Sequence, residues 1–164
     1  MFAAGPKDPP YIRMIDLDVR TLPDRVGQEI GVSDWHEVSQ ATVDQFAAAT
    51  GDRQWIHVDA ERAAKESPFK ATVAHGFLTL SLVSSLLRGA VSPTGLRMAI
   101  NYGLNRVRFT APVVSGSRVR GRFTLGAVEQ VGGAIQATWQ VTVEREGSDK
   151  PACVAEWVVR YYPG

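Results

Sequence analysis

The stretch that decides the fold spans residues 71–87 and reads ATVAHGFLTLSLVSSLL. Between Lys70 and Arg88 it contains no side chain that can carry a charge except His75. As a helix from about Gly76, it presents large apolar side chains in nearly every direction, and such a helix has to be buried on most sides. The run is too short and too rich in Ser and Thr for a membrane span, which needs about 20 apolar residues. We therefore predict a core helix that the rest of the chain wraps.

One polar stripe interrupts this apolar surface. Ser81, Ser84, Ser85 and Arg88 recur at the spacing i, i+3, i+4 and i+7, which places them on one side of a helix. We expect this stripe to face a tight contact, a cavity or a partner.

On both sides of this helix the pattern predicts further elements. Ser39 is a suitable N-cap for an alanine-rich helix that Gly51 ends, and a short first strand is expected in 29–38. After Gly89 the hydrophobic period changes to two, which is typical of strands. Helices are expected in 39–50 and 60–66, and strands in 98–110, 119–125, 135–145 and 155–161. Residues 52–57 are expected to form no element of their own, and 92–95 to form a turn.

Short links between the strands imply antiparallel neighbours, and one apolar sheet face needs a cover. The fold class predicted is therefore α+β, an antiparallel sheet wrapped around the 76–90 helix. Such a sheet has an edge strand, and pairing two sheets edge to edge in a homodimer would protect it. We expect residues 1–25 to be an arm and lead-in, and 26–164 to be a single domain.

Composition excludes several classes of function. The chain has 164 residues, 45% of them hydrophobic, and a formal net charge of +1, which gives no reason to expect nucleic acid or a membrane surface as partner. Cys153 is the only cysteine, so no intrachain disulfide can form, and we read it as a core residue. The chain shows no signal-peptide pattern, and a cytoplasmic location is expected.

Asp52 and His57 are the best candidates for chemistry. They lie five positions apart in a loop directly after a helix, so both side chains can turn into one cleft. A carboxylate and an imidazole that share one water can position it and take its proton near neutral pH. The spacing alone leaves a second interpretation open, in which the Asp caps a turn and the His bonds to backbone.

Gly76 and Ser84 are the next candidates. A glycine that opens a buried helix offers unpaired N–H groups and lets a carbonyl oxygen approach closely, which suits stabilisation of an oxyanion. Gly76 can equally serve only the turn after His75, and Ser84 can be a small residue that permits close packing. His36, His57 and His75 do not have a metal-ligand spacing, and 81–85 lacks the Gly-x-Ser-x-Gly elbow of a serine hydrolase.

Three motifs together resemble the R-specific enoyl-CoA hydratases, which belong to the MaoC-like dehydratases of the hotdog fold. The first is Phe46-Ala-Ala-Ala-Thr-Gly-Asp-Arg-Gln-Trp-Ile-His57, followed after five residues by Ala63. The others are Ala74-His-Gly-Phe77 and Asn101-Tyr-Gly-Leu-Asn-Arg-Val-Arg-Phe109. Where the usual family pattern has Asn-Pro, this chain has Gln54-Trp55, which resembles the NodN-like branch and bears on the substrate range.

The resemblance implies roles position by position. Asp52 and His57 match the catalytic pair that activates water, Gly76 matches the glycine whose N–H receives the thioester carbonyl, and Ser84 matches a serine near the reaction centre in some members. It implies (R)-specific, reversible hydration of trans-2-enoyl-CoA to the (3R)-3-hydroxyacyl-CoA by a homodimer. No metal or other cofactor is expected, because coenzyme A arrives with the substrate. The alternatives are a hotdog acyl-CoA thioesterase and a non-catalytic module that binds acyl thioesters.

Overall fold

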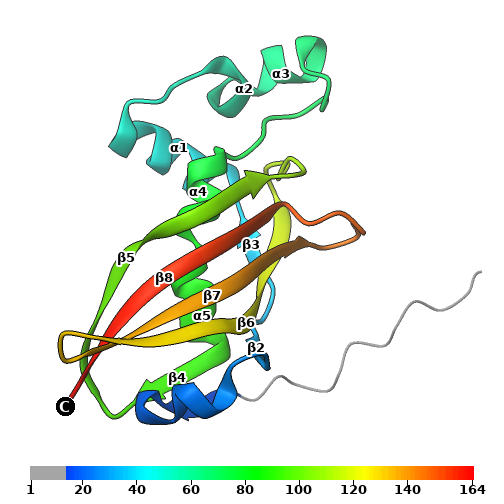
Figure 1. The fold of residues 1–164 in the computed structure, drawn as a ribbon. Helices are drawn as coiled ribbons and strands as arrows, with labels where there is room; N and C mark the ends of the chain where they lie inside the picture. The colour runs from blue at the N-terminus through cyan, green and yellow to red at the C-terminus, as the bar shows by residue number, and fades with distance from the viewer. Residues whose placement is uncertain (1–13) are drawn as a thin grey trace, which may run out of the picture.

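The computed structural model describes residues 14–164. It consists of a curved antiparallel sheet with the helix of residues 76–90 along one face and the short helices of residues 40–66 beyond one end (Figure 1). The sheet order is β2-β6-β7-β8-β5, and β3 also pairs with β6. The strands of this sheet are β2 (Glu29–Val32), β3 (His36–Val38), β5 (Leu96–Phe109), β6 (Ser117–Val131), β7 (Ala134–Arg145) and β8 (Cys153–Pro163). The predicted α+β architecture is confirmed.

The central helix predicted for 76–90 is present, with one irregularity. It is divided into α4 (Gly76–Ser81) and α5 (Val83–Ala90), although Leu82 between them keeps right-handed helical dihedrals. Leu78, Val83 and Leu86 are buried against the sheet, as the sequence predicts. The expectation of burial on most sides is wrong for one flank, because Phe77 is 69% exposed and Ser81, Ser85 and Arg88 are also exposed. Within residues 14–164, nothing covers this flank.

The first helix follows its sequence signals closely. The helix α1 (Gln40–Thr50) begins where the Ser39 side chain accepts a hydrogen bond from the Thr42 amide. It ends at Gly51, whose left-handed φ of 80° suits glycine better than any other residue. The helix α3 (Ala60–Glu66) also matches its predicted range.

Two local predictions are wrong. Residues 52–57 do contain an element, the single turn α2 (Trp55–Val58), which ends the irregular loop after α1. Residues 92–95 are not simply a turn, because β4 (Val91–Thr94) pairs in parallel with β1 (Ile15–Asp18) in a separate two-stranded sheet. Short pairings between segments about 75 residues apart leave no period in the sequence.

The described part of the predicted lead-in packs onto the domain. After β1, the 3-10 helix η1 (Val19–Arg25) follows, and Leu17, Val19 and Leu22 from this segment are buried in the main core. The first 13 residues of the predicted arm and lead-in lie outside the described residues. Among residues 14–164, no helix has the length and hydrophobicity that crossing a bilayer requires.

The core lies between the central helix and the concave face of the sheet. Its largest buried side chains are Trp139 and Phe123, whose rings meet edge to face at 6.5 Å. Cys153 is buried as predicted, and burial raises the pKa of its thiol to about 11, so it is not a thiolate at neutral pH.

Gly121 allows the closest contact between sheet and helix. A Cβ at this position would lie 2.6 Å from the Phe123 ring and 3.0 Å from Leu86 Cβ. We predict that Gly121→Ala lowers the free energy of unfolding by about 1–3 kcal/mol, the usual cost of overpacking a core. Urea denaturation measures this change. Gly89→Ala is the control, since its methyl would meet only Ser33 Cβ at 3.7 Å; an equal loss in both variants would contradict the packing argument.

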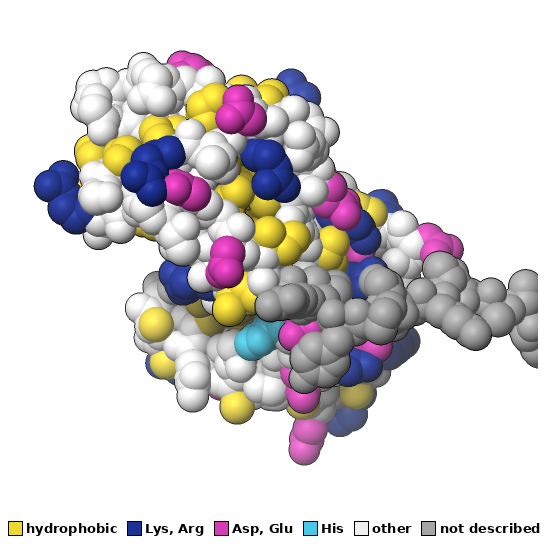
Figure 2. Space-filling model, turned by 90° about the horizontal axis from the view of Figure 1, so that it is seen from below, with side chains coloured by type: hydrophobic (Ala, Val, Ile, Leu, Met, Phe, Trp, Pro, Cys, Tyr) yellow, Lys and Arg dark blue, Asp and Glu magenta, His cyan; other side chains and the backbone are white. Residues whose placement is uncertain are grey.

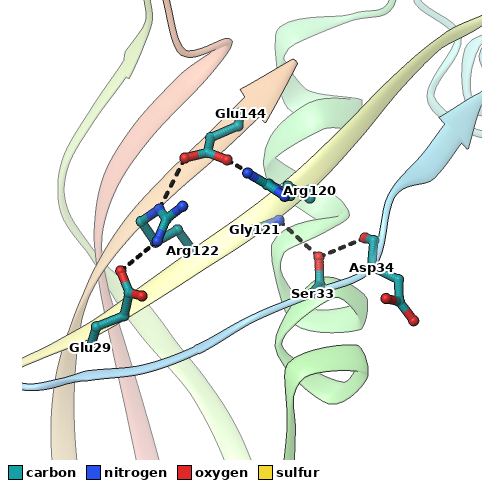
Figure 3. A network of polar contacts seen from close by, with 7 residues as sticks. All are labelled: Glu29, Ser33, Asp34, Arg120, Gly121, Arg122 and Glu144. Carbon is teal, nitrogen blue, oxygen red and sulfur yellow. Dashed lines mark hydrogen bonds and ion pairs between the residues drawn. The ribbon is translucent and has the colours of Figure 1, made fainter. Parts of the chain in front are cut away.

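The convex face of the sheet carries a ladder of ion pairs (Figure 3). Glu144 on β7 accepts from Arg120 Nε at 2.6 Å and from Arg122 Nε at 2.9 Å, and Arg122 Nη1 reaches Glu29 on β2 at 2.7 Å. Nearby, Ser33 Oγ accepts from the Gly121 N–H at the break between β2 and β3. The ladder therefore ties the interrupted edge of the sheet to its centre.

This ladder makes stability dependent on pH. Partial burial raises the pKa of Glu144, but hydrogen bonds from Arg120 and Arg122 outweigh it, and the pKa lies below its ordinary value. Its contribution is therefore present above the unfolded pKa of about 4.3 and is lost as pH falls through the lower, folded value. We predict that Glu144→Gln costs about 0.5–1 kcal/mol at neutral pH, a solvent-screened amount, and much less in acid. Urea unfolding of both proteins against pH measures it; a difference that stays constant would contradict the prediction.

Candidate active site

The loop after α1 brings Asp52 and His57 to one place. Gly51 reverses the chain after α1, Asp52 follows on the surface, and the turn α2 directs His57 inward, where only 7% of it is exposed. Hydrogen bonds join this loop to residues 72–75, which lead into α4. The Val73 amide donates to the Ile56 carbonyl at 3.0 Å, and the His57 and His75 rings each bond across to the other segment.

These cross-links determine which ring nitrogens carry protons. His57 Nδ1 lies 2.6 Å from the Val73 carbonyl oxygen, and His75 Nε2 lies 2.9 Å from the Asp52 carbonyl oxygen. A carbonyl can only accept, so each of these nitrogens is the donor. In the neutral imidazoles, His57 Nε2 and His75 Nδ1 are therefore the atoms left to accept a proton or hydrogen bond.

His75 is the residue of this cluster whose position the sequence did not reveal. Its ring stacks on that of His57 with centroids 3.7 Å apart, and ligating atoms of Asp52, His57 and His75 all lie within 4.8 Å of one another. His75 is 3% exposed, and its Nδ1 has no hydrogen-bond partner in the described part of the chain. The sequence places His75 18 positions beyond His57 and gives no sign that their rings meet.

The stacking bears on whether the three residues form a metal centre. Imidazole lone pairs lie in the ring plane, and the two planes are only 24° from parallel. Stacked, nearly parallel rings direct their lone pairs side by side, whereas a shared metal ion needs them to converge on one point. The arrangement favours proton chemistry by the Asp52 and His57 pair over metal coordination.

Gln40 holds the loop from the α1 side. Its Nε2 donates to the His57 carbonyl and to Asp44 Oδ1, both at 2.8 Å, and its Oε1 accepts from the hydroxyl of buried Thr72. One amide thus connects α1, α2 and the segment before α4. Because these contacts span up to 32 positions of the chain, no local pattern could have identified Gln40.

Gly76 begins α4 directly after His75, so the cluster lies at the start of the central helix. As the first residue of the helix, its N–H has no acceptor within the helix. A Cβ on Gly76 would lie 2.8 Å from the Phe109 ring, and a hollow of about 280 Å³ adjoins it, with Phe69, Thr79 and Phe109 in its lining. The position therefore combines a helix-opening amide with room for a small group beside it.

Ser84 lies about two turns further along, on the predicted polar stripe. The hydroxyls of its neighbours turn back to the helix, Ser81 to the Phe77 carbonyl and Ser85 to the Leu82 carbonyl. Ser84 instead lines two hollows beside the helix. The structure thus brings Asp52, His57 and the residue before Gly76 together and sets Ser84 apart along a groove.

On the face shown in Figure 2, charge indicates no second candidate site. The face shown in Figure 2 carries Lys and Arg interspersed with Asp and Glu, without a broad area of one sign. This agrees with the formal net charge of +1 and favours no polyanionic partner on that face.

A long helix wrapped by a curved antiparallel sheet, with an overhanging loop at the helix start, defines a hotdog fold. The chain belongs to the MaoC-like domain family, whose model matches residues 21–147. Solved structures agree with this fold. The "monoamine oxidase regulatory protein" of Archaeoglobus fulgidus superposes with a TM-score of 0.72 at 19% identity, over 93% of this chain and 99% of that one. The (R)-hydratase of A. caviae, described as involved in PHA biosynthesis, superposes at 0.67 with 27% identity, over 84% and 96%.

Two relatives of known sequence are more similar. The 3-hydroxyacyl-thioester dehydratase Z of Mycobacterium tuberculosis H37Rv is 55% identical over 144 residues, which cover 87% of this chain and 95% of the relative. Nodulation protein N of Rhizobium leguminosarum bv. viciae is 50% identical over 147 residues, covering 88% and 91%. The family predicted from the three sequence motifs is confirmed.

Proposed function

We propose that this protein hydrates trans-2-enoyl-CoA reversibly to (3R)-3-hydroxyacyl-CoA. The observation that carries the proposal is the meeting of Asp52 and His57 beside His75, the residue that directly precedes Gly76. A relative at 55% identity is named a 3-hydroxyacyl-thioester dehydratase, and a structural neighbour at 27% identity is named an (R)-hydratase. Both names support this reaction class over others.

In the proposed mechanism, the Gly76 N–H donates to the thioester carbonyl oxygen and stabilises the negative charge that develops there. One water lies between the Asp52 carboxylate and His57 Nε2. Its oxygen forms the new bond to C3 while the pair takes one of its protons, and a proton is delivered to C2 from the same face. The C2–C3 double bond is lost, and the elements of water are added in full. No step requires a metal or a redox cofactor.

Crotonyl-CoA tests this proposal. We expect its enoyl absorbance to fall when the protein is added and 3-hydroxybutyryl-CoA to accumulate, without release of free thiol. Release of thiol from an acyl-CoA would indicate the thioesterase alternative. Tight binding of acyl-CoA without turnover of any enoyl chain would indicate a binding module, and either result would overturn the proposal.

We propose that the protein acts as a homodimer. The strand β5 is the edge of the sheet, and it exposes apolar side chains, with Tyr102 exposed at 57% and Met98 and Ile100 at over 40% each. An exposed apolar edge is a template for pairing with another strand. Phe77, on the open flank of the central helix, is a further exposed apolar side chain, and a second copy would cover both.

The dimer gives a separate prediction. Sedimentation velocity is expected to give twice the mass of the chain, and Ile100→Lys is expected to weaken association because it places a charge on the apolar edge. Lys150→Ala is the control, since Lys150 is exposed in the turn before β8. A monomer for the unaltered protein at micromolar concentration would contradict the proposal.

A further inference from the structure

Two hollows lie along the central helix beyond Phe77. A cavity of about 210 Å³ lies between α5 and the inner faces of β5 and β8, and Leu17 and Val19 of the lead-in line it too. A second hollow of about 160 Å³ shares Ser84, Asn101 and Trp157 with it and reaches Phe77, next to Gly76. These neighbouring hollows run from the start of α4 into the domain. An acyl chain whose thioester lies at Gly76 would follow this route.

Two polar side chains in this cavity, Asn101 and Tyr161, accept hydrogen bonds from tryptophans. Trp157 Nε1 donates to Asn101 Oδ1 at 2.7 Å, and Trp139 Nε1 donates to the Tyr161 hydroxyl at 3.1 Å. Both acceptors line the cavity. The donor groups of these two side chains, the Asn101 NH₂ and the Tyr161 O–H, have no partner among residues 14–164. Burial raises the pKa of Tyr161 to about 12, so its hydroxyl keeps its hydrogen.

Two more donors reach the same cavity from the helix. The Ser84 hydroxyl has no hydrogen bond within the described chain, unlike those of Ser81 and Ser85. Arg88, one turn further, lines the cavity and has no carboxylate partner within residues 14–164, whereas Arg120 and Arg122 are paired on the other sheet face. Four side chains with unused donor capacity, one of them cationic, therefore line the cavity.

We propose that the acyl group bound in this cavity carries a carboxylate beyond its reacting carbons, held by Arg88 together with Ser84, Asn101 and Tyr161. The inference rests on the proposed function, because it assumes that the thioester lies at Gly76. Beside a plain hydrocarbon chain, the buried Tyr161 O–H and the half-buried Ser84 hydroxyl would lack an acceptor. Arg88 and Asn101 are exposed, and they add a cation and an amide donor to the same cavity. A carboxylate supplies acceptors for several of them, and its charge matches that of the guanidinium.

Calorimetric binding of non-reactive ligands tests the proposal independently of turnover. Two saturated acyl-CoA series of matched chain lengths are compared, one ending in methyl and one in carboxylate. We expect the carboxylate series to bind about tenfold more tightly at the best length, as for hydrogen bonds to a charged group. Equal or tighter binding of the methyl series at every length would overturn the proposal, and would mean that water satisfies these donors.

A variant pair locates the effect. Arg88→Met is expected to remove most of the preference for carboxylate over methyl, while Ser85→Ala, whose hydroxyl bonds to the Leu82 carbonyl, is expected to keep it. A preference that survives Arg88→Met would overturn the assignment of Arg88. Hydration assays with the matching enoyl series separate the two proposals. A carboxylate preference in binding without hydration of any chain would refute the hydratase function alone, and hydration without the preference would refute the further inference alone.

Discussion

Asp52→Asn and His57→Gln are each expected to lower kcat for crotonyl-CoA hydration by a factor of about 10² to 10⁴, the usual contribution of a positioned acid or base. Asp52→Asn removes the carboxylate that would hold the water and keeps the shape of the side chain. His57→Gln keeps a donor that can reach the Val73 carbonyl, so the loop contact survives while the free imidazole nitrogen is lost. Loss of enoyl absorbance at saturating crotonyl-CoA measures kcat for each variant and for the unaltered protein.

Matched controls separate chemistry from folding. Asp34 and His36 are both exposed and precede α1 in the chain, away from the 52–57 loop in sequence. Asp34→Asn and His36→Gln are therefore expected to keep full activity. Circular dichroism and urea unfolding show whether the Asp52 and His57 variants remain folded. The two residues are proposed to act as a pair on one water. A folded variant at either position that keeps the full rate would therefore contradict the proposed mechanism.

Gly76→Ala is expected to lower kcat/KM by about 10² or more, a loss comparable to that of one oxyanion donor. The added methyl would stand where the thioester carbonyl has to approach the amide, and it would also lie 2.8 Å from the Phe109 ring. The ring is partly exposed and can move, so we expect the cost in stability to be small. Steady-state kinetics across a range of crotonyl-CoA concentrations measure the loss.

The double variant Gly76→Ala with Phe109→Ala distinguishes the two consequences of the methyl. Truncating Phe109 removes the clash with the ring but leaves the methyl beside the amide. We therefore expect the double variant to unfold no earlier than Phe109→Ala alone and to stay impaired in hydration. Recovery of full activity in the double variant would show that Gly76 serves packing only.

The parts of this fold that follow from local signals could be predicted from the sequence. Ser39 and Gly51 bound α1 because a capping hydroxyl and a left-handed glycine act on adjacent residues. The period-two alternation in 119–125 and 135–145 marks β6 and β7, since each strand buries one face against the central helix. The strand β6 extends beyond its predicted range at both ends, where alternation is lost.

The parts that depend on distant contacts could not be predicted. The β1–β4 pair and the burial of Leu17 and Leu22 join the start of the described chain to residues after the central helix. In the candidate site, Asp52 and His57 were identified because they lie five positions apart and match a family motif. The stacking of His75 on His57 and the three-way contacts of Gln40 arise only when the chain folds. The exposed flank at Phe77 could not be predicted either, because no part of residues 14–164 covers it.

The most direct test of the central claim is hydration of crotonyl-CoA in D₂O, with the product analysed by chiral chromatography and NMR. Addition of water by Asp52 and His57 to a thioester held at Gly76 predicts (3R)-3-hydroxybutyryl-CoA, with one deuterium at C2 on the face that received the hydroxyl. Formation of the 3S product, addition to opposite faces, or free coenzyme A in place of the hydroxyacyl thioester would contradict it.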